Sequence, residues 1–189
     1  MEKANCRQLM KERLSLIDRI SVAEMSSLIS KNLSHLFSEL DVIPQKIYVG
    51  AFAPMDKEPH LDLLLSSEWE EHIAFPAYNL LQKIMTFKKA RKNELVFNRD
   101  FGPELLGPGP LAQVVIPGLI LIPGLAFSES GMRLGRGKGF YDQYLAHYGG
   151  IKVGVCFSDQ LLDLVPTEKH DVNLDYIVTE KKWIKCKLA

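Results

Sequence analysis

The stretch GLILIPGLAFSESGMRLGRGKGFYDQYLA, residues 118–146, places an apolar run, a glycine-rich segment and a helical pattern directly after one another. The apolar run, 118–127, has the length and composition of a strand buried on both faces, which is typical of the interior of a parallel sheet. The pattern FYDQYLAHY, 140–148, predicts a helix. Ligands bind α/β folds beyond the carboxyl ends of such strands, so we expect the segment from Gly131 to Asp142 to form a binding site.

The rest of the chain also alternates strand and helix patterns. Apolar residues recur at helical spacing over 3–18 and 21–40, and Ser21 followed by Glu24 predicts a capping box at the second helix. The long segment 101–117 predicts a functional loop. Strands are expected at KIYVGAF (46–52), HIAFPAY (72–78), IMTFK (84–88), ELVF (94–97), IKVGVCF (151–157) and DYIVTE (175–180), and short helices at about 60–65 and after 157. These patterns predict an α/β fold with a largely parallel sheet and two N-terminal helices, in a single domain, 1–189.

The composition argues against several classes of partner. Lys plus Arg and Asp plus Glu are equal in number, 23 each, so no bulk positive charge favours nucleic acid or an anionic membrane. The three cysteines are far apart and lack CxxC spacing, which argues against a disulfide framework or a zinc site. The N-terminus has no apolar core of a signal peptide, and no run approaches the roughly 20 apolar residues of a membrane span. We therefore expect a cytoplasmic monomer that binds neither nucleic acid nor membranes.

The glycine-rich segment has the composition of a phosphate site. It alternates three glycines with three cations: Gly135, Gly137 and Gly139, and Arg133, Arg136 and Lys138. The glycines allow positive φ and a close approach of an anion to backbone N–H groups, and the cations supply charged donors. The segment is not a Walker loop, because Gly139 rather than Ser or Thr follows Lys138, and it lacks the GxGxxG pattern of a dinucleotide fold.

Two aspartates are candidate metal ligands. A carboxylate at Asp142 would repel bound phosphate unless a cation lay between them, and Mg²⁺ is commonly held by one or two carboxylates together with phosphate oxygens. Asp171, after His170 in a polar turn, could complete that site. The alternatives remain open at this point: Asp142 could cap a helix beside a solvated basic turn, and the pair at 170–171 could belong to an ordinary polar loop.

Further candidates come from the first half of the chain. Lys3 and Arg7 lie one helical turn apart and could reach one anion, although an exposed charged face would have the same spacing. Glu58 follows a predicted strand end and could accept hydrogen bonds from a ligand rich in N–H groups. Phe52 and Tyr78 could stack on a flat ring or pack in the core. GxSxG and HExxH are absent, so nothing indicates a covalent nucleophile or a zinc hydrolase.

The segments GLILIPGLAF, GMRLGRGKGFYDQYLA and VGVCFSDQLLDLVPTEKHDVNLDYIVTE resemble the 5-formyltetrahydrofolate cyclo-ligase family, also called 5,10-methenyltetrahydrofolate synthetases. The resemblance is specific over about the last third of the chain and extends more loosely to Lys3. It implies a three-layer α/β domain like those of sugar-phosphate isomerases and coenzyme A transferases. It also implies an ATP- and Mg²⁺-dependent closure of 5-formyltetrahydrofolate to 5,10-methenyltetrahydrofolate, with release of ADP and phosphate.

Residue by residue, the resemblance implies a full site. The family's RLGRGKGYYD falls on Arg133 to Asp142, which implies that Asp142 faces Mg²⁺. The aspartate of the family's late HD pair falls on Asp171, which implies a second metal ligand there. Folate contacts are implied for Phe52, Glu58, Tyr78 and Phe140. ATP contacts are implied for Lys3, Arg7, Arg133, Leu134, Gly135, Arg136, Gly137, Lys138, Gly139, Phe140 and Tyr141. Lys138, Arg136 and Arg133 are the expected catalytic residues, because they can offset charge on a transferred phosphoryl group.

The chain departs from the family pattern at three places. Phe140 stands where the family often has Tyr, and Ser128 stands where an Asp is common. FGPELLGPGP, 101–110, matches the family's Gly-Ile-x-Glu-Pro pattern poorly, which leaves the substrate contacts of the 101–117 loop open. Two other functions fit the residues: a non-catalytic homologue that binds nucleotide or folate, and a sugar-phosphate isomerase or acyl transferase on the same fold.

Overall fold

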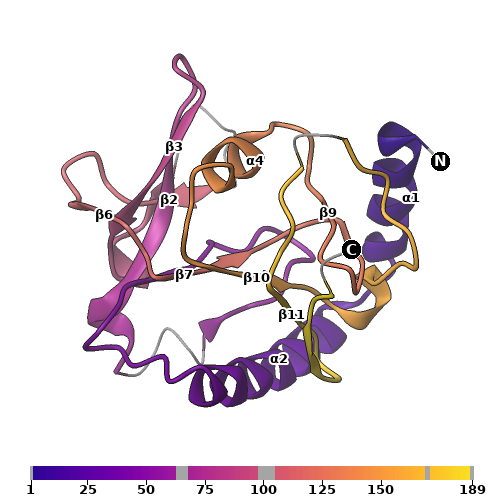
Figure 1. The fold of residues 1–189 in the computed structure, drawn as a ribbon, viewed down its shortest axis with the longest axis horizontal. Coiled ribbons are helices and arrows are strands. Elements are labelled where there is room, and N and C mark those ends of the chain that lie inside the picture. The colour runs from indigo at the N-terminus through magenta and orange to yellow at the C-terminus, as the bar shows by residue number, and fades with distance from the viewer. Residues whose placement is uncertain (1, 63–67, 98–104, 169–170, 188–189) are drawn as a thin grey trace.

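The computed structural model of the 189-residue chain describes residues 2–62, 68–97, 105–168 and 171–187. At its centre is an eight-stranded sheet with the order β12-β11-β10-β7-β1-β2-β3-β6 (Figure 1). Its strands are β1 (Val49–Gly50), β2 (Ile73–Asn79), β3 (Ile84–Lys89), β6 (Val114–Val115), β7 (Leu119–Ile122), β10 (Ile151–Val155), β11 (Tyr176–Val178) and β12 (Trp183–Lys185). Two small ribbons flank it, β4 (Val96–Phe97) with β5 (Leu106–Gly107), and β8 (Ala126–Phe127) with β9 (Arg133–Leu134).

The five strands from β11 to β2 are parallel, and the pairs at both edges are antiparallel. All four residues of β7 are fully buried, and the strand pairs with β1 on one side and β10 on the other. The prediction of a buried central strand is confirmed, and so is the predicted α/β class. The strand is shorter than the apolar run, because Pro123 has no N–H for a sheet ladder, and the run resumes as β8.

The helices cover both faces of this sheet. The α-helices are α1 (Lys3–Ser15), α2 (Arg19–Glu39) and α4 (Phe140–Leu145), and the short 3₁₀ helices are η1 (Glu70–His72), η2 (Lys92–Glu94) and η3 (Ser158–Gln160). Alternate residues of β7 face opposite layers: Leu119 and Leu121 pack in the cluster with α1 and α2, and Ile120 and Ile122 pack in the cluster with α4. Figure 1 shows the same layering, with α2 and α4 on opposite sides of the central strands.

The predicted helix ends differ from those observed. The N-cap of α2 is Asp18, whose side chain accepts hydrogen bonds from the backbone N–H groups of Ile20 and Ser21, at 2.8 and 2.9 Å. The predicted capping box at Ser21 and Glu24 is therefore wrong. Asp18 rather than Ser21 caps the helix because a carboxylate is a stronger acceptor for these N–H groups than a hydroxyl is. Ser21 instead donates its hydroxyl to the carboxylate of Asp18.

The structure also differs from the sequence in the extent of several predicted strands and loops. The strand predicted over 46–52 has only the two residues of β1, whereas β12 was not predicted at all. The predicted loop at 101–117 contains β5 and β6 within its described part, and its first residues lie outside the described ones. Residues 63–65 of the helix predicted at about 60–65 also lie outside them. Within the described ranges, no helix combines the length and apolar composition needed to cross a lipid bilayer.

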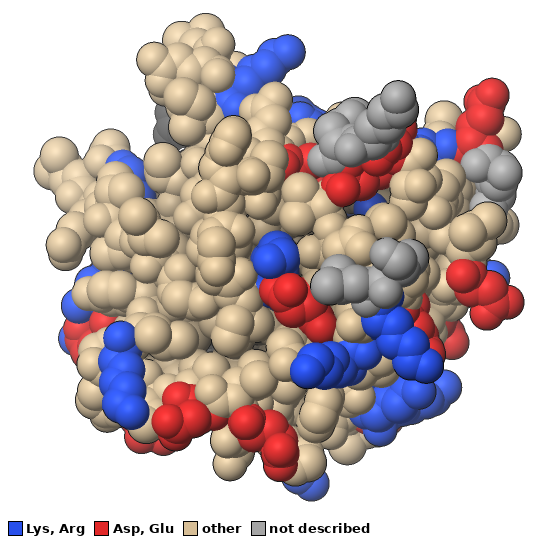
Figure 2. All heavy atoms as spheres, in the orientation of Figure 1, with Lys and Arg blue, Asp and Glu red and all other residues tan. Residues whose placement is uncertain are grey.

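Surface charge is mixed on the face seen in Figure 2. Lys and Arg side chains lie interspersed with Asp and Glu side chains, and no continuous region of one sign covers this face. In the same orientation, much of the left half, over the side of the molecule where Figure 1 places β3 and β6, carries uncharged side chains.

Candidate active site

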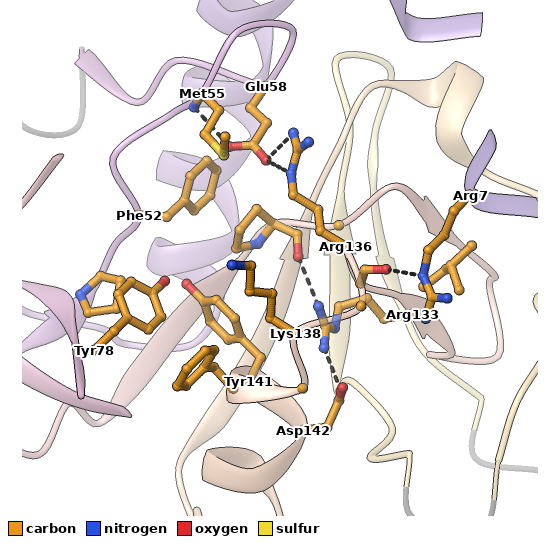
Figure 3. A pocket seen from close by; sticks show the side chains of 18 of the residues that line it. Arg7, Phe52, Met55, Glu58, Tyr78, Arg133, Arg136, Lys138, Tyr141 and Asp142 are labelled. Atoms are coloured by element: carbon orange, nitrogen blue, oxygen red, sulfur yellow. Dashed lines mark hydrogen bonds and ion pairs between the residues drawn. The ribbon is translucent and has the colours of Figure 1, made fainter. Parts of the chain in front are cut away.

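A cavity of about 340 Å³ lies beyond the carboxyl ends of the central strands, where the sequence predicted a site. This volume is within the range of small-molecule sites. The cavity is lined by the predicted site residues Lys3, Arg7, Phe52, Glu58, Tyr78, Asp142, Asp171 and all of 133–141. Gly131 and Met132, the first two residues of the segment predicted to form the site, are not among its lining residues. Residues from the N-terminal helix, from three strand ends and from the C-terminal third of the chain thus meet around one space (Figure 3).

The glycine-rich loop connects β9 to α4 and forms one wall. Gly137 has φ of 102° and Gly139 has φ of 75°, in the region that side chains other than glycine's rarely adopt. Gly135 does not have positive φ, contrary to the prediction. A Cβ there would lie 2.9 Å from Nη1 of Arg133, so a side chain at this position would require the Arg133 guanidinium to shift.

Arg133 is a buried member of this wall. Its Nη2 donates to Oδ1 of Asp142 at 2.5 Å, and its Nη1 donates to the carbonyl oxygen of Pro123 at 3.2 Å. The guanidinium also lies 5.5 Å from the centre of the Tyr141 ring, in cation–π range. Arg133 therefore ties the first turn of α4 to the end of β7 and holds Asp142 at the cavity.

Helix α1 brings two cations to the same cavity. Arg7 donates from Nε to the carbonyl oxygen of Gly135 at 3.0 Å, which fixes the helix against the glycine-rich loop (Figure 3). Lys3 places its Nζ 2.8 and 3.0 Å from the two carboxylate oxygens of Asp171, and 3.4 Å from Glu168. The two cations separated by one helical turn are thus not a solvated surface pair, and Asp171 does not lie in an isolated polar turn.

Glu58 forms a further ion pair of the cavity, with Arg136. Its Oε1 accepts from Nε and Nη2 of Arg136 at 3.0 and 2.8 Å, while its Oε2 accepts from the backbone N–H of Met55 at 2.9 Å (Figure 3). The residue is only 5% exposed. A buried carboxylate needs such partners, and a ligand that replaced Arg136 would have to donate hydrogen bonds of its own.

Aromatic rings form the opposite wall. Phe52 is buried, and the rings of Tyr78 and Phe140 pack edge to face with their centres 5.2 Å apart. In Figure 3 the hydroxyls of Tyr78 and Tyr141 turn toward each other, and the Lys138 side chain extends from the loop toward this group. Burial raises the pKa of both phenols, and each lies close enough to alter the pKa of the other. Among the described residues, the buried Tyr141 hydroxyl has no hydrogen-bond partner in good geometry.

A complete metal cage is not present. Among the described residues, no three or more His, Cys, Asp or Glu side chains form a group that could hold a metal ion. Asp142 and Asp171 nevertheless line one cavity together with several cations. Their oxygens suit Mg²⁺ that arrives with bound phosphate, since that ion takes most of its ligands from phosphate and water. His170, which the sequence nominated beside Asp171, lies outside the described residues.

Some lining residues were not nominated from the sequence. Pro123 and Gly124 follow the central strand directly, so the rule that sites lie beyond strand ends could have found them. Leu105 and Leu106 belong to the segment 101–117, which the sequence predicted as a functional loop without naming individual residues. Ala53, Met55 and Glu168 give no signal of their own in the sequence.

Comparison with curated proteins gives a consistent group of relatives. A 5-formyltetrahydrofolate cyclo-ligase from Mycolicibacterium smegmatis is 46% identical over 68 residues, which cover 35% of this chain and 35% of that protein. A relative from Arabidopsis thaliana, named as the mitochondrial 5-formyltetrahydrofolate cyclo-ligase, is 29% identical over 163 residues, or 79% of this chain and 53% of that protein. The matched part of this chain thus spans only about a third of the first curated relatives and about half of the Arabidopsis protein.

Comparison with solved structures shows the fold. The NMR structure of a 5,10-methenyltetrahydrofolate synthetase from Aquifex aeolicus superposes with a TM-score of 0.80 at 24% identity, covering 100% of this chain and 95% of that one. A synthetase of the same name from Mycoplasma pneumoniae gives 0.70 at 20% identity, covering 95% of this chain and 99% of that one. A family model matches residues 1–180, and it is that of the 5-formyltetrahydrofolate cyclo-ligase family. The chain therefore belongs to this family, as its motifs indicated.

Proposed function

We propose that the chain converts 5-formyltetrahydrofolate to 5,10-methenyltetrahydrofolate, using MgATP and releasing ADP and phosphate. One observation carries the proposal: a wall of cations and carboxylates and a wall of aromatic rings face the same cavity. A triphosphate with its metal suits the first wall, and the flat pterin ring of a folate suits the second.

The nucleotide is assigned to the glycine-rich loop and α1. Gly137 and Gly139 leave their backbone N–H groups accessible to phosphate oxygens, and Lys138 supplies a charged donor from the same loop. Lys3 and Arg7 provide two further cations from the N-terminal helix. Arg133 is better suited to hold Asp142 in place than to move onto a phosphate, because it is only 8% exposed and already has three contacts.

Asp142 and Asp171 are the residues that would hold Mg²⁺. The ion would neutralise charge shared by the phosphates and the two carboxylates. In its absence Arg133 and Lys3 neutralise the same two carboxylates. The two carboxylates are thus held at the cavity wall by neighbouring cations.

The folate is assigned to the aromatic wall. Phe52, Tyr78 and Phe140 offer ring faces and edges, and Glu58 offers carboxylate oxygens to the N–H groups of a pterin. Phe140 retains a ring where the family often has Tyr, and its packing on Tyr78 shows that the ring alone fills this place.

The chemistry needs positioning more than a protein nucleophile. The formyl group is an amide, so its oxygen is a poor leaving group until it is phosphorylated. In the proposed route this oxygen attacks the γ-phosphorus, and ADP leaves as its bond to the γ-phosphate breaks. Nitrogen 10 then attacks the formyl carbon and loses its proton, and phosphate departs with the former formyl oxygen. Lys138 and Arg136 offset the charge that develops on the transferred group. The aromatic wall holds the formyl group against the nucleotide.

A direct assay tests the proposal. Purified protein is mixed with 5-formyltetrahydrofolate and MgATP, and the absorbance of methenyltetrahydrofolate is followed while ADP is measured in parallel. We expect product and ADP in equal amounts. A folded protein that binds both substrates without product would instead be a non-catalytic homologue, and one that binds sugar phosphates without consuming ATP would be an isomerase or transferase. A cytoplasmic location and a monomeric state stay predictions.

A further inference from the structure

Ion pairs join acidic residues to cations in the described lining of the cavity. Lys3 pairs with Asp171 and Glu168, Arg133 pairs with Asp142, and Arg136 pairs with Glu58. The pairs of Lys3 with Asp171 and of Arg133 with Asp142 join groups assigned to the nucleotide and its metal. The Arg136–Glu58 pair differs, because it joins a residue assigned to the folate, Glu58, to a residue assigned to the nucleotide phosphates, Arg136. Neither ligand can take its full set of contacts while this pair is closed.

Glu58 is held in place independently of Arg136. Its Oε2 accepts from the backbone N–H of Met55, and its own N–H donates to the Met55 carbonyl at 3.1 Å. The preceding Lys57 has φ of 63°, and its Nζ donates to the carbonyl of Ile17 at 2.6 Å, which anchors the turn to the connection between α1 and α2. The carboxylate therefore stays where it is when its other oxygen changes partner.

Arg136 is the partner that can move. It lies between Gly135 and Gly137, and its side chain is 36% exposed, whereas that of Glu58 is 7% exposed. Its Nε and Nη2 both donate to the same oxygen of Glu58, Oε1. A ligand N–H that took this oxygen would release the guanidinium at the cavity wall, within the loop assigned to the phosphates.

We propose that the Glu58–Arg136 ion pair couples the two substrates, so that each one binds more tightly when the other is present. The first ligand to bind must break the ion pair, and the free energy that this requires weakens its binding. The second ligand then binds to a residue of the pair that is already released. Reciprocity then requires folate to tighten nucleotide binding by the same factor as nucleotide tightens folate binding. The inference rests on the proposed function, since it assumes that the two ligands are a folate and a nucleotide.

Binding without turnover measures the coupling. Isothermal titration calorimetry gives the dissociation constant of MgAMP-PNP, which cannot donate its γ-phosphate, with and without saturating 5-formyltetrahydrofolate. For the wild-type protein we expect the folate to tighten nucleotide binding about tenfold, inside the roughly 5- to 150-fold range of coupled sites. The converse titration should give the same factor.

Two substitutions separate the pair from general charge effects. Glu58→Gln keeps an acceptor for the backbone N–H of Met55 but frees Arg136. In the absence of folate, the variant should therefore bind the nucleotide about tenfold more tightly than wild type does, which equals the full coupling factor. Arg136→Gln frees Glu58, so folate alone should bind more tightly although the cavity has lost a cation. General electrostatics predicts the opposite sign for Arg136→Gln, because the folate carries carboxylates.

Matched controls remove the same charges elsewhere in the cavity. Glu168→Gln removes a carboxylate and Arg7→Gln removes a guanidinium. Glu168 pairs with Lys3, and Arg7 donates to the backbone carbonyl of Gly135. Thermal unfolding verifies that each variant is folded. The expected result is that both pair variants lose the coupling and both controls keep it.

Three results would overturn the inference. One is a wild-type coupling factor of 1 in a protein that forms product, which leaves the proposed function intact. Another is Arg136→Gln weakening folate binding as much as Arg7→Gln does. The third is Glu58→Gln tightening nucleotide binding no more than Glu168→Gln does. A wild-type protein that binds no 5-formyltetrahydrofolate would overturn the proposed function itself, and the nucleotide titrations of the two glutamate variants would still decide whether the pair opposes nucleotide binding.

Discussion

Replacing Arg133 with Met should destabilise the fold as well as the site. The Arg133 side chain is 5% exposed, and it contacts Asp142, the carbonyl of Pro123 and the ring of Tyr141. Met keeps most of the length and the apolar volume but removes the charge. Asp142 would then remain near the cavity, 28% exposed, without its guanidinium.

The size of the loss follows from these contacts. Removing one partner of a buried ion pair costs about 3–5 kcal/mol, and the partial exposure of Asp142 favours the lower end of that range. The expected decrease in the free energy of unfolding is therefore about 3 kcal/mol. For a domain of this size, about 1 kcal/mol corresponds to roughly 2–4 °C, so the melting temperature should fall by about 6–12 °C.

Urea unfolding of a double-mutant cycle provides the assay. Asp142→Asn removes the other charge of the pair, and the Arg133→Met/Asp142→Asn protein lacks both. The double variant should be more stable than the sum of the single effects predicts, by at least about 1 kcal/mol, since the two side chains are in contact. Additive single effects, or an Arg133→Met protein within about 0.5 kcal/mol of wild type, would refute the structural role assigned to Arg133.

Three more predictions concern the loop and its neighbours. Lys138→Ala should lower kcat by about 100-fold or more, because a positioned donor is lost, and unchanged turnover would remove Lys138 from the mechanism. Gly137→Ala places a side chain at φ of 102°, so it should weaken MgAMP-PNP binding and lower the free energy of unfolding by more than about 1 kcal/mol. Gly149→Ala is the control and should be nearly neutral, because a Cβ there meets no atom within 4 Å and the residue has no positive φ. Equal effects of the two substitutions would contradict the strain argument. Burial raises the pKa of Tyr141 in the folded protein. As the pH rises above about 10, the Tyr141 hydroxyl therefore loses its proton in the unfolded chain before it does so in the folded protein, and the free energy of unfolding falls by up to about 1.4 kcal/mol per pH unit. Tyr141→Phe should make that decline shallower in urea unfolding between about pH 10 and 11, and an unchanged slope would contradict the burial of the hydroxyl.

The central strand and the glycine-rich loop could be predicted from the sequence because each is encoded by residues that are contiguous in the chain. The apolar run at 118–127 predicts a strand buried on both faces, and its residues 119–122 form β7. Glycines alternating with cations predict an anion site after this run. The recurrence of apolar residues also predicted α1 and α2. Where two local signals competed, as at Asp18 and Ser21, the pattern favoured the wrong capping residue.

The partners of the site residues could not be read in the same way. Lys3 and Asp171 are 168 positions apart in the chain, and nothing near either residue indicates the other. The bond between Glu58 and Arg136 likewise depends on how the turn after β1 and the loop after β9 meet in space. The resemblance to the family implied that each of these residues contacts a ligand. The structure shows in addition that the acidic residues pair with cations of the same cavity.

Transfer of the formyl oxygen to phosphate is the most direct test of the proposed reaction. 5-Formyltetrahydrofolate labelled with ¹⁸O in the formyl group is incubated with the protein and MgATP, and the released phosphate is analysed by mass spectrometry. If the formyl oxygen is activated by phosphorylation, each phosphate released with methenyltetrahydrofolate carries one ¹⁸O atom. Unlabelled phosphate in the presence of product would contradict this account.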